Sequence, residues 1–535
     1  MSDNTHDAII VGAGVCGIYM LYRLLNLGLK VKVLEAADGP GGTWHWNRYP
    51  GARFDSESYT YGYSFSKELL EEWDWSEHFA AQPETLRYLN YVVDKFSLRD
   101  HMEFDTRIKS AQFDEASNQW LITSDTGEQY RSTYFCTAIG MLSAATLPRI
   151  QGTSDFLGES YHTYYWPKEP VDLENKRVAV IGTGATGVQV IGAIAEQVKQ
   201  LTVFQRRPNW CAPLHNAPIS EGEMQKIKSS YDEIFAKCQS TASGFIHSHD
   251  TRSVKEVPTE EKHAFWNKLY NSPGFGVWVG NFKDVLVDPE ANAEYSDFIA
   301  NKIRERVKDP ITAEKLIPKD HGFGTRRVPL ETRYYEAYNL DHVRLVDITE
   351  NPIECIEAKG VKTAQELMEF DVIIYATGFD AITGAFDRID ITGVDGIKLA
   401  DKWKDGPITC FGVQVAGFPN MFMLAGPQGA SVASNFPPAI EAAVDWAADF
   451  MEQLYKEGVD RVEADADAES EWQEYVKSFY ETSLLAGTQS WFTGYNSNVE
   501  GHDKLRHMIY LGGAPAYRRI LSEAADNGYP QFKTR

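Results

Sequence analysis

The sequence is poor in cysteine, in positive charge and in long apolar runs. Its 535 residues include six cysteines and no Cys-x-x-Cys pair, so we expect no zinc ribbon, no dithiol centre and no other metal site. The net charge of −24 disfavours nucleic acids and anionic membranes as partners. No apolar run reaches about 18 residues, so we expect no transmembrane helix. The start of the chain is polar, which predicts no signal peptide and, with the scattered thiols, a cytoplasmic protein.

Two glycine-rich motifs, GAGVCG and GTGATG, share one spacing in a chain long enough for two or three domains. Each follows an apolar strand, at 7–11 and 177–181, and opens a helix, which is the context of a dinucleotide-binding turn. A third strand of this kind, at 371–378, suggests that a domain begun early is completed after an insertion. The glycines are Gly12, Gly14 and Gly17 in the first motif and Gly182, Gly184 and Gly187 in the second.

The residue at the end of the second strand, the one that follows each glycine motif and its helix, differs between the two motifs. Glu35 ends the strand at 31–36, where a carboxylate accepts hydrogen bonds from ribose hydroxyls and repels a phosphate, so the first site predicts FAD or NAD. Gln205 stands at the matching place in the second, and Arg206 and Arg207 follow it. Guanidinium groups bind phosphate, so this site predicts NADP(H). A surface glutamate and a pair of surface arginines are the plainer alternatives.

Two further segments carry groups that suit a flavin site. Segment 39–58 is rich in glycine and aromatic residues, which bring backbone and rings against a flat cofactor. Segment 323–327 ends in Arg326 and Arg327, of which one suits the NADP(H) phosphate and the other an anionic flavin peroxide. An exposed arginine pair is the alternative. In the first segment, the residues expected to contact FAD are Gly42, Thr43, Trp44, Trp46, Tyr49 and Asp55.

Between the two glycine motifs, residues 156–167 read FLGESYHTYYWP. With this segment the chain resembles the type I Baeyer–Villiger monooxygenases, whose signature is F-x-G-x-x-x-H-x-x-x-W-[PD]. The related flavin-containing monooxygenases, which oxidise amines and sulfides, carry Tyr or Phe in place of the tryptophan. Segments 41–55, 323–327, 375–386 and 417–429 add to the resemblance. The signature residues are Phe156, Gly158, His162, Trp166 and Pro167.

The resemblance implies an α/β protein with two Rossmann-like domains, for FAD and NADP, and a helical insertion. The expected boundaries are 1–145 with 385–535 for FAD, 146–214 with 323–384 for NADP, and 215–322 for the insertion. It also implies NADPH- and O2-dependent oxidation of aliphatic, cyclic or aryl ketones to esters or lactones, through a flavin C4a-peroxide. An N- or S-oxygenating flavoenzyme and a non-oxygenating NADPH-linked flavoprotein remain alternatives. The expected partners are a small ketone and O2, with the chain as a monomer or weak homo-oligomer.

The resemblance also assigns roles to residues. Arg327 matches the arginine that stabilises the flavin peroxide and the ketone adduct, and Asp55 matches the acid that positions it. Arg206 matches a contact to the NADP 2′-phosphate, and Arg326 stands where lysine is common. His162 matches a residue that couples domain movement to the cycle. The remaining NADP contacts expected are Thr183, Thr186, Ala376, Thr377 and Trp491, the last from a loop that closes over the nicotinamide.

One segment, 428–439, bears on the substrate. Cyclohexanone-type relatives look shorter here, whereas those that act on aryl ketones or steroids carry a similar bulge. We therefore expect Ser434, Asn435 and Phe436 to line or shape the substrate pocket.

Overall fold

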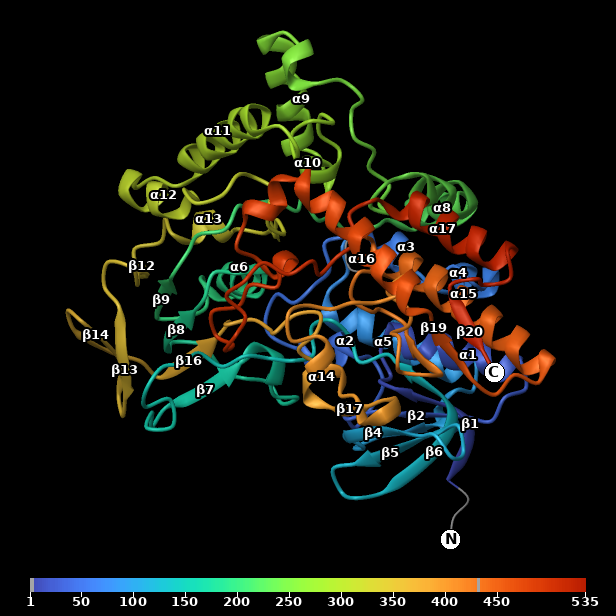
Figure 1. Ribbon diagram of the computed structural model, residues 1–535. Coiled ribbons are helices and arrows are strands. Elements are labelled where there is room, and N and C mark those ends of the chain that lie inside the picture. Colours follow the sequence, from blue (N-terminus) through green and yellow to red (C-terminus); the bar gives the residue numbers. More distant parts are fainter. Residues whose placement is uncertain (1–3, 431–433) are drawn as a thin grey trace.

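Two β-sheets lie side by side beneath a cap of helices (Figure 1). The computed structural model describes residues 4–430 and 434–535. The first sheet gathers strands from residues 5–137 and 390–423, and the second gathers strands from residues 159–375. This arrangement confirms the predicted α/β class.

The first sheet is centred on β1 (Thr5–Val11), which pairs in parallel with β2 (Val31–Leu34) and β6 (Gln129–Thr137). Ile9 and Ile10 of β1 are fully buried, as expected for a parallel strand that is covered on both faces. The other strands are β3 (Met102–Glu103), β4 (Ile108–Asp114), β5 (Gln119–Ser124), β17 (Asp390–Thr392) and β18 (Met421–Met423). The strand order is β17-β4-β5-β6-β1-β2-β3, and β18 also pairs with β6.

The second sheet is parallel throughout, in the order β12-β9-β8-β16-β7. Its strands are β7 (Glu159–His162), β8 (Arg177–Ile181), β9 (Gln200–Gln205), β12 (Val343–Asp347) and β16 (Val372–Tyr375). The late strand predicted at 371–378 is β16, and it lies beside β8. A small antiparallel sheet adjoins in sequence, formed by β13 (Ile353–Glu357), β14 (Gly360–Thr363) and β15 (Leu367–Glu369).

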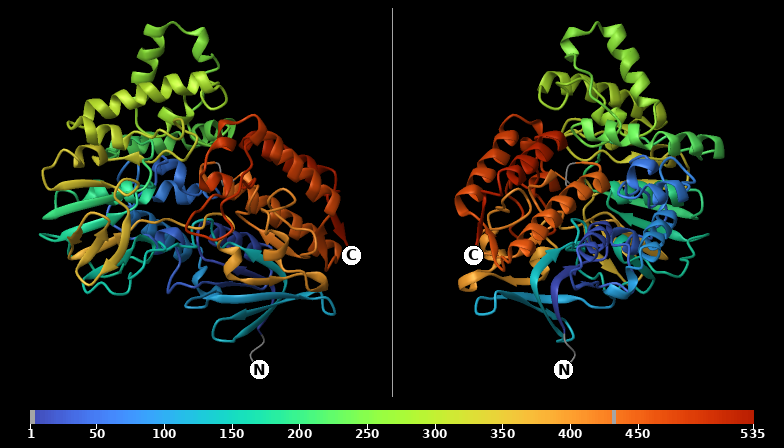
Figure 2. Two further views of the ribbon diagram at one scale, coloured as in Figure 1. Left: turned by 60° about the vertical axis from the view of Figure 1, so that its left-hand side comes forward. Right: turned by 90° about the vertical axis from the view of Figure 1, so that its right-hand side faces the viewer.

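Helices from both ends of the chain cover the first sheet, and Figure 2 shows the C-terminal ones in orange and red. α1 (Val15–Asn26) packs against α15 (Phe436–Glu457). Both contribute buried apolar residues to one core, including Ile18 and Val444. The other helices of these parts are α2 (Thr43–Trp46), α3 (Ser58–Tyr61), α4 (Lys67–Glu72), α5 (Gln82–Lys95), α14 (Leu399–Lys402), α16 (Ala466–Glu481) and α17 (Ala514–Asp526).

The segment 215–322 is helical and forms a cap, of which residues 259–316 lie at the top of Figure 1. Trp266 and Tyr295 belong to the same buried core as Val180 and Val203 of the second sheet, so this part of the cap is packed onto that sheet. Met224 and Tyr231, at the start of the segment, belong instead to the core of the first sheet. The helices of the cap are α7 (Glu221–Ser229), α8 (Tyr231–Ser240), α9 (Thr259–Tyr270), α10 (Gly276–Val279), α11 (Pro289–Arg306) and α12 (Pro310–Leu316).

Two short elements follow the cap, β11 (Leu330–Glu331), which pairs with β10 (Ala212–Pro213), and α13 (Tyr334–Ala337). At the C-terminus β19 (Val462–Ala464) pairs with β20 (Phe532–Thr534). Across residues 4–430 and 434–535, no helix is long and apolar enough to cross a membrane. The domain boundaries proposed from the sequence stay a prediction.

Candidate functional site

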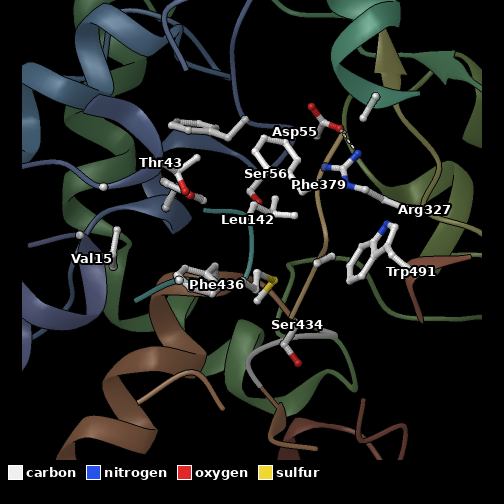
Figure 3. A pocket seen from close by; sticks show the side chains of 18 of the residues that line it. Val15, Thr43, Asp55, Ser56, Leu142, Arg327, Phe379, Ser434, Phe436 and Trp491 are labelled. Carbon is white, nitrogen blue, oxygen red and sulfur yellow. Dashed lines mark hydrogen bonds and ion pairs between the residues drawn. The ribbon is translucent and has the colours of Figure 1, made fainter. Parts of the chain in front are cut away.

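A cavity of about 1030 Å³ lies where the two glycine motifs, the cap and the C-terminal part meet (Figure 3). Each of these four parts contributes residues to its wall. Gly14 comes from the first motif, Gly184 from the second, Phe275 from the cap and Trp491 from the C-terminal part. The cavity therefore brings together segments that lie far apart in the sequence.

The first glycine motif forms the turn between β1 and α1. Gly12 has φ 106°, and a Cβ there would lie 2.4 Å from the carbonyl oxygen of Ala138, so neither the angle nor the space suits another residue. A Cβ at Gly17 would lie 1.9 Å from the Gly12 carbonyl oxygen, so Gly17 allows the helix to pack closely. Gly12 and Gly14 line the cavity, and Gly14 is the N-cap of α1, whose first amides suit an anion.

Glu35 lines the cavity directly after β2, as its position in the sequence predicts. Its carboxylate accepts hydrogen bonds from the backbone N–H of Ala13 at 2.7 Å and of Ala37 at 2.8 Å. Burial raises the pKa of the Glu35 carboxyl, and these two amides oppose the rise. Glu35 therefore ties the glycine turn to the end of β2 while it faces the cavity.

The aromatic residues of segment 39–58 line the cavity, together with Gly42 and Thr43. Trp46 stacks on Tyr164, with ring centroids 5.4 Å apart and planes at 16°. The Tyr49 hydroxyl donates to the amide oxygen of Gln189 on α6 at 2.8 Å. Trp44 donates its indole N–H to the Tyr61 hydroxyl at 3.3 Å. This wall therefore connects the first sheet to the second, and no sequence motif pointed to Tyr164 or Gln189.

The second glycine motif repeats the geometry between β8 and α6 (Ala185–Ile194). Gly182 has φ 112°, and Gly184 is the N-cap of α6. A Cβ at Gly184 would meet no atom of the described chain within 4 Å, so the motif opens into the cavity here. Gly184 and Thr186 line the cavity, as does Ala376.

Four other residues predicted to contact NADP, three from this motif and Thr377 after β16, make close contacts or hydrogen bonds within the chain. A Cβ at Gly182 would lie 2.4 Å from the Ala376 carbonyl oxygen, and one at Gly187 would lie 2.2 Å from that of Gly182. The Thr183 hydroxyl donates to the Arg207 carbonyl at 3.0 Å, and the Thr377 hydroxyl donates to the Thr146 carbonyl at 2.6 Å.

Three arginines gather beyond this motif. Arg206 contacts the Ser497 hydroxyl, and Arg207 donates to the amide oxygen of Gln489 at 2.8 Å. Arg326, with its side chain 15% exposed, pairs with Asp320 at 3.0 Å. Burial lowers the pKa of the Arg326 guanidinium; Asp320 opposes this, and the charges of Arg206 and Arg207 add to it. Asp320 lies 3.0 Å from Arg326 and 3.9 Å from Arg207, and the charge of Arg206 also acts on Arg326, so the cluster has an excess of positive charge, which suits a phosphate.

Gln205, which takes the place of the carboxylate in the second motif, is buried at the end of β9. Its amide N–H donates to the Lys315 carbonyl at 2.7 Å. Comparison of the two motifs predicted that this position has no carboxylate, but it could not predict the contact of Gln205 with Lys315 of the cap.

Arg327 and Asp55 form an ion pair at the wall of the cavity (Figure 3), with Nη1 2.8 Å from Oδ2. The side chain of Asp55 is 3% exposed, and Oδ2 also accepts from the Leu330 N–H at 3.3 Å. Its other oxygen, Oδ1, is buried and finds no hydrogen-bond partner in the described chain. The side chain of Arg327 is 33% exposed, and its guanidinium lies 5.7 Å from the ring centroid of Phe275. A fixed cation therefore faces the cavity.

The predicted pocket residues differ in where they point. Ser434 and Phe436 line the cavity (Figure 3). Asn435 is buried, and its amide N–H donates to the Thr60 carbonyl at 3.2 Å and the Thr60 hydroxyl at 3.1 Å. It anchors the start of α15 instead of lining the cavity. Residues 431–433 of the expected bulge lie outside the described residues.

Trp491 lines the cavity from a C-terminal loop, as does Arg327 from the segment after the cap (Figure 3). The loop is held to the segment that follows β16. Asn496 donates to the Phe379 carbonyl at 2.9 Å, and His502 pairs with Asp380 at 2.9 Å. The contact of Arg206 with this loop joins it to the arginine cluster.

The signature segment 156–167 runs along β7, at the edge of the second sheet. His162 is buried, its Nδ1 accepts from the Tyr164 N–H at 3.1 Å, and burial lowers the pKa of its imidazole. A Cβ at Gly158 would lie 2.5 Å from the Phe156 ring and 2.6 Å from the Asp371 carbonyl. Trp166 packs on Tyr161 at 5.2 Å, directly before Pro167. The segment therefore forms the edge strand of the second sheet and the turn that follows it.

The comparisons with known proteins agree with this geometry. The model of the pyridine nucleotide-disulphide oxidoreductase family matches residues 9–269. The 2-oxo-Delta(3)-4,5,5-trimethylcyclopentenylacetyl-CoA monooxygenase of Pseudomonas putida is 44% identical over 98% of both chains. A Baeyer-Villiger monooxygenase of Pseudooceanicola batsensis is 39% identical over 98% of this chain and 95% of its own. The crystal structure of OTEMO in complex with FAD and NADP is 44% identical, covers 99% of each chain and superposes with a TM-score of 0.96.

Proposed function

The chain belongs to the Baeyer–Villiger monooxygenases, and we propose that its cavity holds FAD and NADP(H) and oxidises ketones to esters or lactones. The reaction consumes one NADPH and one O2 for each ester and releases water. The observation that carries the assignment is the Asp55–Arg327 pair, which fixes a positive charge at the cavity shared by the two glycine motifs.

The residues around the first motif fit FAD. The amides that begin α1 suit a pyrophosphate, and Glu35 is placed for ribose hydroxyls at the end of β2. Trp44, Trp46 and Tyr49 provide flat apolar surface along the cavity. We assign the first motif to FAD because its acidic residue is unsuited to a 2′-phosphate.

The residues around the second motif fit NADP(H). Gly184 leaves open space at the start of α6, where a pyrophosphate can approach the backbone. We assign the 2′-phosphate to the cluster of Arg206, Arg207 and Arg326. Asp320 holds Arg326 in place and leaves the cluster with a net positive charge.

The chain's own contribution to catalysis is charge, orientation and exclusion of water. FAD, once reduced by NADPH, supplies the activation of O2. Arg327 stabilises negative charge that develops on oxygen, because its guanidinium is already oriented when that charge appears. Asp55 fixes the orientation through its 2.8 Å contact. Trp491 and Phe436 line the cavity with apolar surface, which keeps water away and receives the hydrocarbon part of a ketone.

Two alternatives make different demands on this site. A non-oxygenating flavoprotein has no developing charge for Arg327 to stabilise. An N- or S-oxygenating enzyme has no need of a group that stabilises a ketone adduct, and Trp166 occupies the position that carries Tyr or Phe in flavin-containing monooxygenases. The ketone reaction is therefore the function that the residues support best.

A panel of aliphatic, cyclic and aryl ketones tests the proposal. The holoenzyme should oxidise NADPH slowly alone and faster with an accepted ketone, and gas chromatography should detect the ester or lactone. Amines and sulfides serve as the competing substrates. Ketone-independent NADPH oxidation, or N- and S-oxides as the sole products, would contradict it.

We also propose that the protein works in the cytoplasm as a monomer or weak homo-oligomer. All six cysteines are free thiols in the part of the chain that the structure describes, and five of them are buried, which suits a reducing compartment. Size-exclusion chromatography with light scattering measures the oligomeric state, and a stable tetramer at micromolar concentration would rule out the proposed monomer or weak homo-oligomer.

A further inference from the structure

A second buried acid, Glu57, lies two positions after Asp55 in the sequence. Glu57 has a side chain that is 5% exposed, and its Oε1 lies 2.7 Å from Nε2 of His247. Its Oε2 is buried and has no hydrogen-bond partner within residues 4–430 and 434–535. The side chain of His247 is 19% exposed and lines the cavity. A buried carboxylate is costly unless it is paired, so His247 is the group that makes this position tolerable.

The Glu57–His247 pair is pressed against a glycine-flanked turn of the cap, Gly274-Phe275-Gly276. A Cβ at Gly274 would lie 2.4 Å from Oε1 of Glu57 and 3.1 Å from Nε2 of His247. A Cβ at Gly276 would lie 3.2 Å from Nδ1 of His247. Gly274 has φ 77°, which also favours glycine. Both glycines therefore leave the room that the imidazole and the carboxylate occupy.

Phe275, between these glycines, is the residue that lies under the Arg327 guanidinium, 5.7 Å from its ring centroid. It also packs on Phe245, two residues before His247, with centroids 4.9 Å apart. The contacts form a closed ring. Asp55 holds Arg327, Arg327 lies on Phe275, the turn of Phe275 packs on His247, and His247 pairs with Glu57 on the segment that carries Asp55.

From this ring we propose that Glu57 and His247 are positioning residues for Arg327. The pair fixes the turn that carries Phe275, and Phe275 fixes the face of the guanidinium that Asp55 leaves free. This inference rests on the proposed function, because it assigns the pair to the oxygenation step. We assign the pair no role in the hydride transfer that precedes that step.

Matched substitutions at His247 test the proposal. His247→Leu removes the hydrogen bond to Glu57, whereas His247→Gln places an amide N–H near the position of Nε2. Phe275→Leu removes the ring under Arg327 and keeps apolar bulk. We expect His247→Leu and Phe275→Leu to lower the ester formed per NADPH oxidised by about fivefold or more, the effect of one cation–π contact. His247→Gln should restore most of that loss.

One rate measurement, one double variant and one control variant distinguish a positioning role of the pair from a general role in folding. Stopped-flow reduction of the flavin by NADPH should stay within about twofold of the parent in all three variants. The double variant His247→Leu/Phe275→Leu should lose no more coupling than the worse single variant, since both act on one guanidinium. His342→Leu is the control, because His342 lies directly before β12, its Nε2 is 2.7 Å from the Ala195 carbonyl oxygen, and neither residue lines the cavity.

The outcomes decide the matter. Unchanged coupling in His247→Leu would overturn the proposal, as would equal losses of flavin reduction and of coupling, which indicate general damage. Failure of His247→Gln with normal FAD content and melting temperature would overturn the role of the hydrogen bond. If the parent itself forms no ester from any ketone, the proposed function fails, and that result is distinct from a selective failure of the variants.

Discussion

Replacing Arg327 with alanine removes the fixed cation at the cavity and leaves Asp55 without its ion-pair partner. We expect Arg327→Ala to bind FAD and to be reduced by NADPH, because hydride transfer develops no negative charge that this side chain must stabilise. Ester formation should nearly vanish. The variant therefore separates the two half-reactions at a single residue.

The magnitude follows from the geometry. Loss of one preorganised donor at a developing oxyanion costs about 2.7–4 kcal/mol, or 100- to 1,000-fold in rate. A second cost falls on stability, because Asp55 is 3% exposed and keeps one hydrogen bond, from Leu330 at 3.3 Å. Breaking a buried pair costs up to about 3–5 kcal/mol, and the 33% exposure of Arg327 reduces that figure here. The double variant Arg327→Ala/Asp55→Asn removes the unpaired charge and should recover melting temperature without recovering ester formation.

Stopped-flow flavin reduction and product analysis on one preparation measure both effects. The reasoning fails if Arg327→Ala makes ester at the parent rate, or if flavin reduction falls as far as oxygenation does. It also fails if the double variant recovers ester formation, since the defect would then lie in the unpaired carboxylate and not in the missing cation.

Three further substitutions have separate readouts. Arg206→Ala should raise KM for NADPH at least about tenfold, the effect of roughly 1.4 kcal/mol, and leave KM for NADH nearly unchanged; equal losses with both nucleotides would exclude contact with the 2′-phosphate. His162→Ala should keep its FAD but turn over slowly and couple poorly, and isolation as a flavin-free protein would assign His162 to the core instead. Glu441 is a buried residue of α15, and its burial raises the pKa of the carboxyl from 4.5 to about 7, so the parent binds a proton on folding and loses stability as pH rises through this range. The free energy of unfolding of Glu441→Gln has no such pH dependence, so between pH 4.5 and pH 8 it should rise by on the order of 3 kcal/mol relative to that of the parent. The melting temperatures of the two proteins should therefore move apart as pH rises, and a constant difference would contradict the raised pKa.

The sequence predicted those parts of the fold that are encoded locally. The strand expected at 177–181 is β8, and the helix expected after the second glycine motif is α6, which begins at Ala185. A strand, a glycine turn and a helix are specified by adjacent residues, so pattern alone is sufficient. The late apolar strand at 371–378 was also predicted, as β16, because it carries the same pattern as the early ones, whereas its pairing with β8 is seen in the structure alone.

What the sequence left open depends on contacts between distant segments. The Asn435 side chain donates to Thr60 of α3, and the buried amide of Gln205 donates to Lys315 of the cap. The role of Phe275 under Arg327 depends on how the cap folds onto the second sheet. The two glycines around Phe275 are the only trace of this role in the sequence. Their purpose, to leave room for His247 and Glu57, is seen only in the folded structure.

The central claim is that this chain inserts one oxygen atom of O2 beside a ketone carbonyl. Incubation of the holoenzyme with NADPH, an accepted ketone and ¹⁸O2, followed by mass spectrometry, tests it most directly. The account predicts one ¹⁸O atom in each ester, the second in water, and one NADPH oxidised per ester in the fully coupled reaction. An unlabelled ester, or label found only in hydrogen peroxide while the ketone is recovered unchanged, would contradict it.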